Sequence, residues 1–388
     1  MTKLNFIYLD HQASTPLCDE AWSAMVPFYR GNHANPHSIH HFLGIKASGA
    51  IECARAQIAY NINANPNEIV FTSGATEPNN LAIIGASSKA PQSKRCILIS
   101  AIEHKCVLEA ALHLQKSGFS VKYIPINAEG VVNLNALKQL LSDHDVFMIS
   151  IMAINNEIGS IQPIKESAKI AHAHGALIHC DAAQATTNSR VNVEEWEVDF
   201  LSLSSHKMNG PKGVGALYIS GESRSSINPI QFGGGQENGM RSGTLPTALC
   251  VGFGAAANYW TKNGDDLRAN IKNLRNHFWS KLQNTIPNAR LMGPKLSERH
   301  KGNLCIHFPD IDAELLLGMI QFKVGASTGS ACTSGIPEPS HVISAIGDDD
   351  ALTDGAIRFS FGPETSYSDL DKAVSCIAIA VKSLIEKT

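Results

Sequence analysis

Seven short apolar runs separated by helical stretches constrain the fold of this chain more than any other feature. The runs are continuously apolar, and most are divided by amphipathic stretches such as residues 165–174. Strands that are buried on both faces have this pattern, so it predicts a mostly parallel sheet covered by helices on both sides. Ligands bind such sheets at the carboxyl ends of the strands. The predicted strands are residues 69–72, 96–100, 121–126, 146–151, 177–181, 200–204 and 214–219.

The pattern changes after a long helical stretch at about residues 265–283. We expect a large α/β domain over residues 16–262, and a smaller α+β domain formed by residues 1–15 and 263–388. Strand and helix signals alternate in this last part without the earlier βα repetition. They predict strands at 303–308 and 356–361 and helices at 313–322 and 368–387.

Composition excludes several classes of protein. Of 388 residues, 44% are apolar and 17% are charged, which indicates a large core and no disordered tail. The net charge of −3, with no basic run, gives no reason to expect direct binding to nucleic acid or a membrane. No signal peptide or long apolar stretch is visible, and the nine cysteines are scattered. We therefore expect reduced thiols and a cytoplasmic location.

An aspartate and a lysine at the ends of two predicted strands suggest a pyridoxal phosphate site. Asp181 ends the run 177–181, and Lys207 follows the run 200–204. A lysine can form an imine with the cofactor aldehyde, and a carboxylate can keep the pyridine nitrogen protonated so that the ring accepts electrons. A structural ion pair between two strands is the alternative that these two residues alone leave open.

Nearby residues offer partners for the cofactor's phosphate and ring. The turn at 74–80 follows a predicted strand and begins a helix. Its backbone N–H groups and the Thr76 hydroxyl could therefore bind an anion. An ordinary N-cap turn, which has the same pattern, is the alternative. Ser204 and His206 lie beside Lys207 and could bind the same phosphate. His104 could stack on the ring and handle protons near neutral pH, although a lone histidine is more often structural.

Two further residues are candidates for the chemistry of a substrate. The segment 327–340 is rich in Gly, Ser and Pro around Cys332, which is typical of an exposed, mobile loop with an accessible thiol. An incidental loop cysteine is the alternative. Arg358, on a predicted strand, could bind a carboxylate through two hydrogen bonds, or could be a surface arginine. The histidines at 33, 37, 40 and 41 fit no zinc pattern, so we expect no metal.

Nine motifs appear in order along the chain: YLDHQASTP (8–16), NPHSIH (35–40), TSGATEPNN (72–80), EHK (103–105), NNEIG (155–159), DAAQ (181–184), SHK (205–207), RSGT (241–244) and GSACTS (329–334). Together they resemble the group I cysteine desulfurases, the type found in iron–sulfur assembly and nitrogenase maturation. The resemblance spans nearly the whole chain. Two positions depart from it: Asn238 stands where an arginine is usual, and Gly362-Pro363 replaces a commoner Gly-Arg.

The resemblance implies a class-V aminotransferase-like, fold-type I pyridoxal phosphate enzyme that forms a homodimer. It implies a seven-stranded large domain, and a small domain that carries the Cys332 loop. The implied roles are Lys207 as the Schiff-base lysine, Asp181 at the pyridine nitrogen, Gln184 near the ring oxygen, His104 on the ring, Ala75, Thr76, Ser204 and His206 at the phosphate, Thr244 at the other subunit's phosphate, Asn156 at the cofactor and substrate, Arg358 at the substrate, and Cys332 as the sulfur acceptor.

The predicted reaction takes sulfur from L-cysteine, leaving L-alanine and a persulfide on Cys332. An acceptor protein would then receive the sulfur for iron–sulfur cluster assembly, tRNA thiolation or DNA phosphorothioation. A selenocysteine lyase or an aminotransferase of the same fold is the first alternative. A non-catalytic subunit that uses the fold to bind partners is the second.

Overall fold

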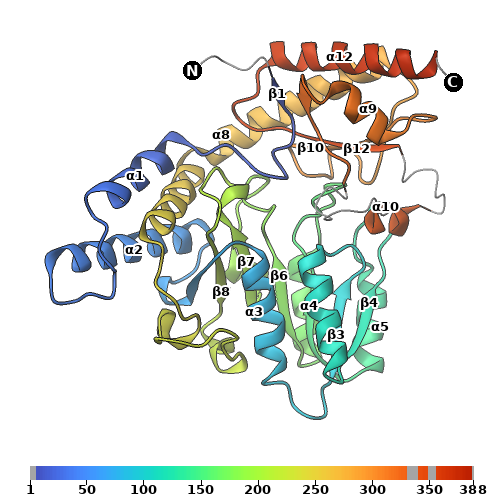
Figure 1. The fold of residues 1–388 in the computed structure, drawn as a ribbon. Coiled ribbons are helices and arrows are strands. Elements are labelled where there is room, and N and C mark those ends of the chain that lie inside the picture. The colour runs from blue at the N-terminus through green and yellow to red at the C-terminus, as the bar shows by residue number, and fades with distance from the viewer. Residues whose placement is uncertain (1–5, 330–339, 348–354, 387–388) are drawn as a thin grey trace.

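A computed structural model describes residues 6–329, 340–347 and 355–386 (Figure 1). Its large sheet has seven strands in the order β2-β8-β7-β6-β5-β3-β4. Only β8 runs antiparallel to its neighbours, and the remaining pairs are parallel. The prediction of a mostly parallel sheet is therefore confirmed. The strands are β2 (Ile69–Thr72), β3 (Cys96–Ser100), β4 (Ser120–Ile124), β5 (Val146–Ser150), β6 (Leu177–Asp181), β7 (Phe200–Ser204) and β8 (Gly215–Ile219).

The sheet has two apolar faces because successive strand residues point to opposite sides. In β3, for example, Ile97 and Ile99 belong to one core cluster and Leu98 belongs to the other. The cluster that contains Ile97 and Ile99 packs against α3 (Thr76–Ser87) and α4 (Lys105–Lys116). Against the other face pack α2 (Phe42–Asn61), α5 (Leu134–Asp143), α6 (Ile164–Ala173) and α7 (Val193–Trp196).

The helix α8 (Thr247–Thr285) is much longer than the predicted stretch at about 265–283. Its first half contains Gly252 and Gly254, which are unfavourable in an isolated helix. A Cβ atom at these positions would lie 2.5 Å from Met25 Sδ and 2.5 Å from Ala54 Cα, respectively. The glycines therefore allow close packing against α1 (Asp19–Arg30) and α2. The predicted domain boundary at 262/263 falls inside this helix, and the division into domains stays a prediction.

The C-terminal part of the chain forms a smaller layer at the far end of α8 (Figure 1). A three-stranded antiparallel sheet is flanked by helices, and β1 pairs in parallel with β11. Within the described ranges, no helix has the length and apolar character needed to cross a bilayer. The elements are β1 (Ile7–Tyr8), β9 (Arg290–Leu291), β10 (Asn303–His307), α9 (Ala313–Ile320), β11 (Val324–Gly325), α10 (His341–Ile346), β12 (Ala356–Ser360) and α12 (Tyr367–Ile385).

The segment after β1 connects the small sheet to the large one. Asp10 forms a bridge with Ser360 at the end of β12. Five residues later, the Thr15 backbone N–H donates to the carbonyl of His206, 2.9 Å away, just beyond β7. The N-terminal residues therefore pass over the carboxyl end of the large sheet, where ligands bind in folds of this kind.

Candidate active site

The ends of β2, β6 and β7 meet at one edge of the large sheet. Gly215, the first residue of the antiparallel β8, pairs with Thr72 on one side and with Ser204 on the other. Asp181, the last residue of β6, pairs with Ser202 of β7. The three strand ends that the sequence marks as polar therefore meet at one edge of the sheet, with the start of β8 between β2 and β7, although Thr72 and Ser204 are 132 positions apart in the sequence.

Lys207 follows β7 in a short 3-10 helix, η2 (Ser205–Lys207), beneath the N-terminal segment. Its Nζ donates to the carbonyl oxygens of Gln12 at 2.5 Å and Ala13 at 2.9 Å. Gln184 donates from Nε2 to the same Gln12 carbonyl, at 2.9 Å. Gln12 thus links two residues with predicted cofactor roles. It lies in the motif at 8–16, but no role was predicted for it, because a backbone carbonyl gives no signal in a sequence.

Asp181 is almost fully buried, with 5% of its surface exposed. Its Oδ2 accepts a hydrogen bond from Asn79 Nδ2 at 2.7 Å, and its Oδ1 accepts one from the Ala183 backbone N–H at 3.0 Å. A carboxylate that accepts two such bonds is fixed in orientation. Asn79 lies three residues after Thr76 in α3, and its role was not predicted. Its place in the motif at 72–80 was the only available signal.

His104 caps the start of α4, where its Nδ1 accepts from the Cys106 backbone N–H at 3.2 Å. The Cys106 Sγ lies 3.0 Å from the same nitrogen. Burial lowers the pKa of His104. Asp181 acts to raise this pKa, and Lys207 lowers it further. The ring is therefore neutral near pH 7 and carries its proton on Nε2, a tautomer inferred from these contacts. Such a ring can stack on a cofactor and exchange a proton.

The donors available at the strand ends fit a phosphate group. α3 begins at Thr76 after Ala75, which makes no side-chain cap, so its first N–H groups can bind an anion. The Ser204 hydroxyl is buried without a hydrogen-bond partner, which in a native site commonly marks the place of a missing ligand. Burial, with Lys207 and Lys212 adding to it, lowers the pKa of His206 to about 4, so the imidazole is neutral near pH 7.

Arg358 is buried rather than at the surface, which makes the alternative of a surface arginine wrong. Its Nη1 donates to the Asn156 carbonyl at 2.9 Å. Its Nη2 donates to Asp10 Oδ1 at 2.7 Å and to Ser327 Oγ at 2.8 Å, and the buried Nε makes no hydrogen bond. The two residues expected to hold substrate, Asn156 and Arg358, are therefore in contact.

Two other predicted residues are not part of this cluster. Thr244 is exposed, on a segment that an ion pair between Arg241 and Glu77 ties to the first turn of α3, at 2.8 Å. Its predicted reach to a second subunit stays a prediction. Cys332 lies outside the described residues. Over the described ranges, no three or more His, Cys, Asp or Glu side chains gather as they would around a metal ion.

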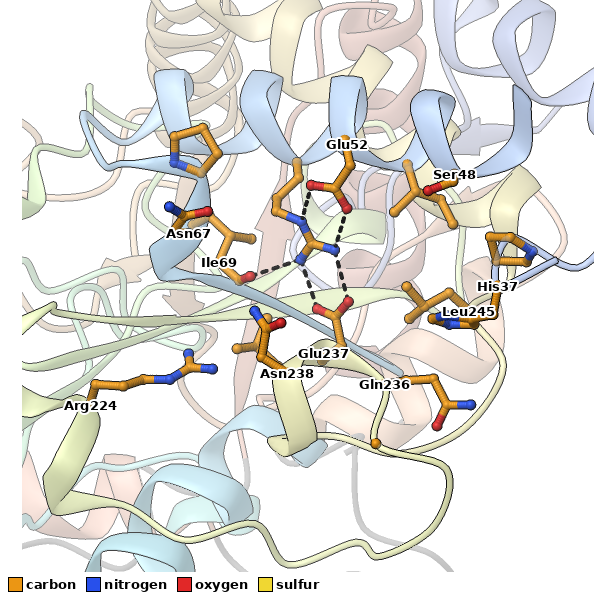
Figure 2. A pocket seen from close by; sticks show the side chains of 16 residues that line it. His37, Ser48, Glu52, Asn67, Ile69, Arg224, Gln236, Glu237, Asn238 and Leu245 are labelled. Carbon is orange, nitrogen blue, oxygen red and sulfur yellow. Dashed lines mark hydrogen bonds and ion pairs between the residues drawn. The ribbon is translucent and has the colours of Figure 1, made fainter. Parts of the chain in front are cut away.

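A separate cavity of about 440 Å³ lies between α2 and the segment at 235–238 (Figure 2). Arg55 crosses it and donates to both carboxylate oxygens of Glu237, at 2.7 and 2.8 Å. Asn238, one of the two departures from the family pattern, lines the same cavity in a left-handed conformation with φ of 53°. Asparagine tolerates this conformation better than arginine does, which gives a local reason for the departure.

A family model for class-V aminotransferases matches residues 7–373. The chain belongs to the class-V aminotransferase family. It is 42% identical over 378 residues to the cysteine desulfurase IscS of Rickettsia bellii, covering 97% of this chain and 92% of that protein. A solved NifS-like protein superposes with a TM-score of 0.91 at 34% identity, covering 97% of this chain and all of the other.

A second solved structure, SspA in complex with cysteine, has a TM-score of 0.82 at 34% identity and covers 93% of this chain and all of the other. Together these relatives confirm the predicted family and its fold-type I architecture. They also confirm the predicted cysteine desulfurase activity and the dependence on pyridoxal phosphate.

Proposed function

We propose that this chain is a cysteine desulfurase in which Lys207 carries pyridoxal phosphate and Cys332 receives the sulfur. The observation that supports the proposal most directly is the convergence of Lys207, Asp181 and His104 beside the unpartnered hydroxyl of Ser204. When bound, the cofactor supplies an electron sink for carbanion chemistry at the substrate. The non-catalytic alternative would not require a lysine, an ordered carboxylate and an unpartnered buried hydroxyl at one place.

Each residue of the candidate active site has a separate proposed role. Asp181, held by Asn79, would support the protonated pyridine nitrogen of the cofactor, and Gln184 and His104 would hold its ring. Ala75, Thr76, Ser204 and His206 would hold its phosphate. The Lys207 amine, positioned by the Gln12 and Ala13 carbonyls, moves the proton of the substrate Cα.

Arg358 and Asn156 hold the substrate next to this amine. The buried Arg358 guanidinium, which pairs with Asp10 and donates to the Asn156 carbonyl, supplies the positive charge for an amino-acid carboxylate, because charge-assisted hydrogen bonds are strong. The Cys332 thiolate attacks the substrate sulfur. An S–S bond forms and the substrate Cβ–S bond breaks, and its electron pair stays on Cβ, which takes up a proton. The products are alanine and an enzyme persulfide, and no external oxidant is required.

The partners of the protein follow from this chemistry. A protein acceptor removes the persulfide sulfur, and iron–sulfur assembly, tRNA thiolation and DNA phosphorothioation remain alternative destinations. Two protomers associate so that Thr244 of each reaches the phosphate site of the other. Its exposure on an anchored segment supports this arrangement. The expected location is the cytoplasm.

The test compares sulfide and alanine production from L-cysteine in the presence of a reductant. The parent protein is expected to release the two products in equal amounts, and Cys332→Ser is expected to release neither above background. Cys53→Ser is the matched control, because Cys53 is an exposed thiol on α2 and should not affect turnover. Amino-group transfer to a 2-oxo acid that does not depend on Cys332 would favour the aminotransferase alternative. Selenide release from L-selenocysteine that does not depend on Cys332 would favour the lyase.

A further inference from the structure

A buried carboxyl group contacts both flanks of the segment that contains Cys332. Glu157 lies in the loop after β5, next to Asn156, with 5% of its surface exposed. Its Oε2 accepts a hydrogen bond from Ser340 Oγ at 2.5 Å. A Cβ atom on Gly329 would lie only 2.2 Å from the same oxygen, so the backbone at Gly329 passes directly against the carboxyl group. Gly329 and Ser340 are the last and first described residues around segment 330–339.

The backbone of Glu157, on both sides of this side chain, is itself held by buried neighbours. The Glu157 backbone N–H donates to Asn155 Oδ1 at 2.9 Å, and the Glu157 carbonyl accepts from Asn303 Nδ2 at 2.9 Å. Asn155 and Asn303 are both fully buried. Glu157 is therefore a fixed point in the loop that also carries the proposed substrate residue Asn156.

Both flanks are also attached to residues around the candidate active site. Before the segment, the Arg358 backbone N–H donates to the Ser327 carbonyl at 2.7 Å. After it, Ser340 caps α10 through the Ile343 N–H, and His341 Nε2 contacts the carbonyl of Glu103, the residue before His104. Gly329 and Ser340, which are eleven positions apart, thus meet at one carboxyl group beside the site.

We propose that Glu157 is a positioning residue for sulfur transfer, because it holds together the two ends of the segment that carries Cys332. The proposal rests on the proposed role of Cys332 as sulfur acceptor. Cys332 follows Gly329 by three residues and precedes Ser340 by eight. Fixing both ends reduces the conformational search that the thiol must make to meet the substrate sulfur. Steps that need only Lys207 and the cofactor are not affected.

The test measures two reactions in the full-length protein loaded with pyridoxal phosphate. One is the single-turnover rate of persulfide formation on Cys332. The other is the exchange of the α-hydrogen of L-alanine with deuterated water, which requires no thiol. In Glu157→Ala and Ser340→Ala, persulfide formation is expected to slow roughly tenfold, as for the loss of one buried hydrogen bond. Hydrogen exchange should stay within about twofold of the parent rate.

Three further variants test whether the effect comes from the hydrogen bond between Ser340 and Glu157. Glu157→Gln keeps an oxygen that can accept the Ser340 hydroxyl, so it should lose no more than about threefold. The double variant Glu157→Ala with Ser340→Ala should be no slower than Glu157→Ala alone, because the two residues act through one contact. Ser167→Ala is the matched control. Ser167 is a buried serine of α6 that donates to the Pro163 carbonyl at 2.8 Å, and its loss should change neither reaction.

Persulfide formation in Glu157→Ala within about twofold of the parent rate would overturn the proposal, as would a parallel loss of hydrogen exchange. If the parent forms no persulfide, the proposed function fails rather than the anchoring. Proteolysis of the cofactor-free protein then decides the matter. Cleavage within 330–339 should be roughly tenfold faster in Glu157→Ala than in the parent or Ser167→Ala, because the anchored ends limit local opening. Equal rates of cleavage would refute the anchoring.

Discussion

Replacing Asn79 with alanine tests how Asp181 is held. Asn79 is fully buried, and its Nδ2 donates to Asp181 Oδ2 at 2.7 Å. After the substitution, the backbone N–H of Ala183 is the remaining donor described for this carboxylate. A hydrogen bond to a charged group contributes about 1.5–3 kcal/mol. Since about 1.4 kcal/mol corresponds to tenfold in rate, kcat should fall by roughly 10- to 100-fold if this bond orients Asp181 for catalysis.

The assay measures initial rates of alanine formation over a range of L-cysteine concentrations, at equal cofactor content. KM should change by less than about threefold, because Asp181 is proposed to contact the cofactor and not the substrate. Asn80→Ala is the matched control. The Asn80 Nδ2 donates to the Thr76 carbonyl of its own helix at 2.9 Å, at the surface, so kcat should be unchanged.

A double substitution shows whether the fall in kcat caused by Asn79→Ala is due to its effect on Asp181. Adding Asn79→Ala to Asp181→Ala should cause no further fall in kcat, because the acceptor of the bond is already absent. A kcat for Asn79→Ala within about twofold of the parent value, with full cofactor content, would refute the reasoning. So would a rise in KM with kcat unchanged.

Three other changes have defined outcomes. Lys207→Ala should abolish turnover and the visible absorbance of covalently bound cofactor, and measurable turnover would contradict its assignment. Cys332→Ser should keep the cofactor spectrum and α-hydrogen exchange but retain no reductant-labile radioactive sulfur from labelled cysteine, whereas labelling at the parent's stoichiometry would mean that another cysteine is the acceptor. Glu237→Ala should lower the free energy of unfolding by about 1–3 kcal/mol, because Arg55 and the Phe71 backbone N–H lose a buried acceptor while Arg55 keeps its ion pair with Glu52. An unchanged unfolding transition in urea would argue against that contribution.

The local pattern of the sequence was enough to predict the strands and the residues at their ends. Strands buried on both faces are continuously apolar, so β2, β3 and β5 to β8 could be located without knowledge of their neighbours, whereas β4 lies at the edge of the sheet and is mostly exposed. Polar residues directly after such runs stand out, which is why Asp181, Ser204 and Lys207 could be named. Cys332 was identified from sequence alone, from the composition of its segment and the family motif.

The packing of α8 could not be predicted in this way. Gly252 and Gly254 lower the helix propensity of the first half of α8, so the local sequence pattern predicts a helix that begins too late. In the structure these glycines allow α8 to pack closely against α1 and α2, and that packing outweighs their unfavourable propensity. Whether a glycine ends a helix or permits a close contact depends on a partner far away in the sequence.

Only the tertiary structure decided which distant residues complete the site. Asn79 and Asp181 are 102 positions apart, and Asp10 and Arg358 are 348 apart. The antiparallel β8 between β2 and β7 brings Thr72 and Ser204 to either side of Gly215. The Gln12 carbonyl reaches Lys207 because the N-terminal segment passes over the sheet. The period of apolar residues and the local composition indicate whether each segment is a strand, a helix or a loop. The contacts named here depend instead on strand order and register, which are set only when the whole core packs.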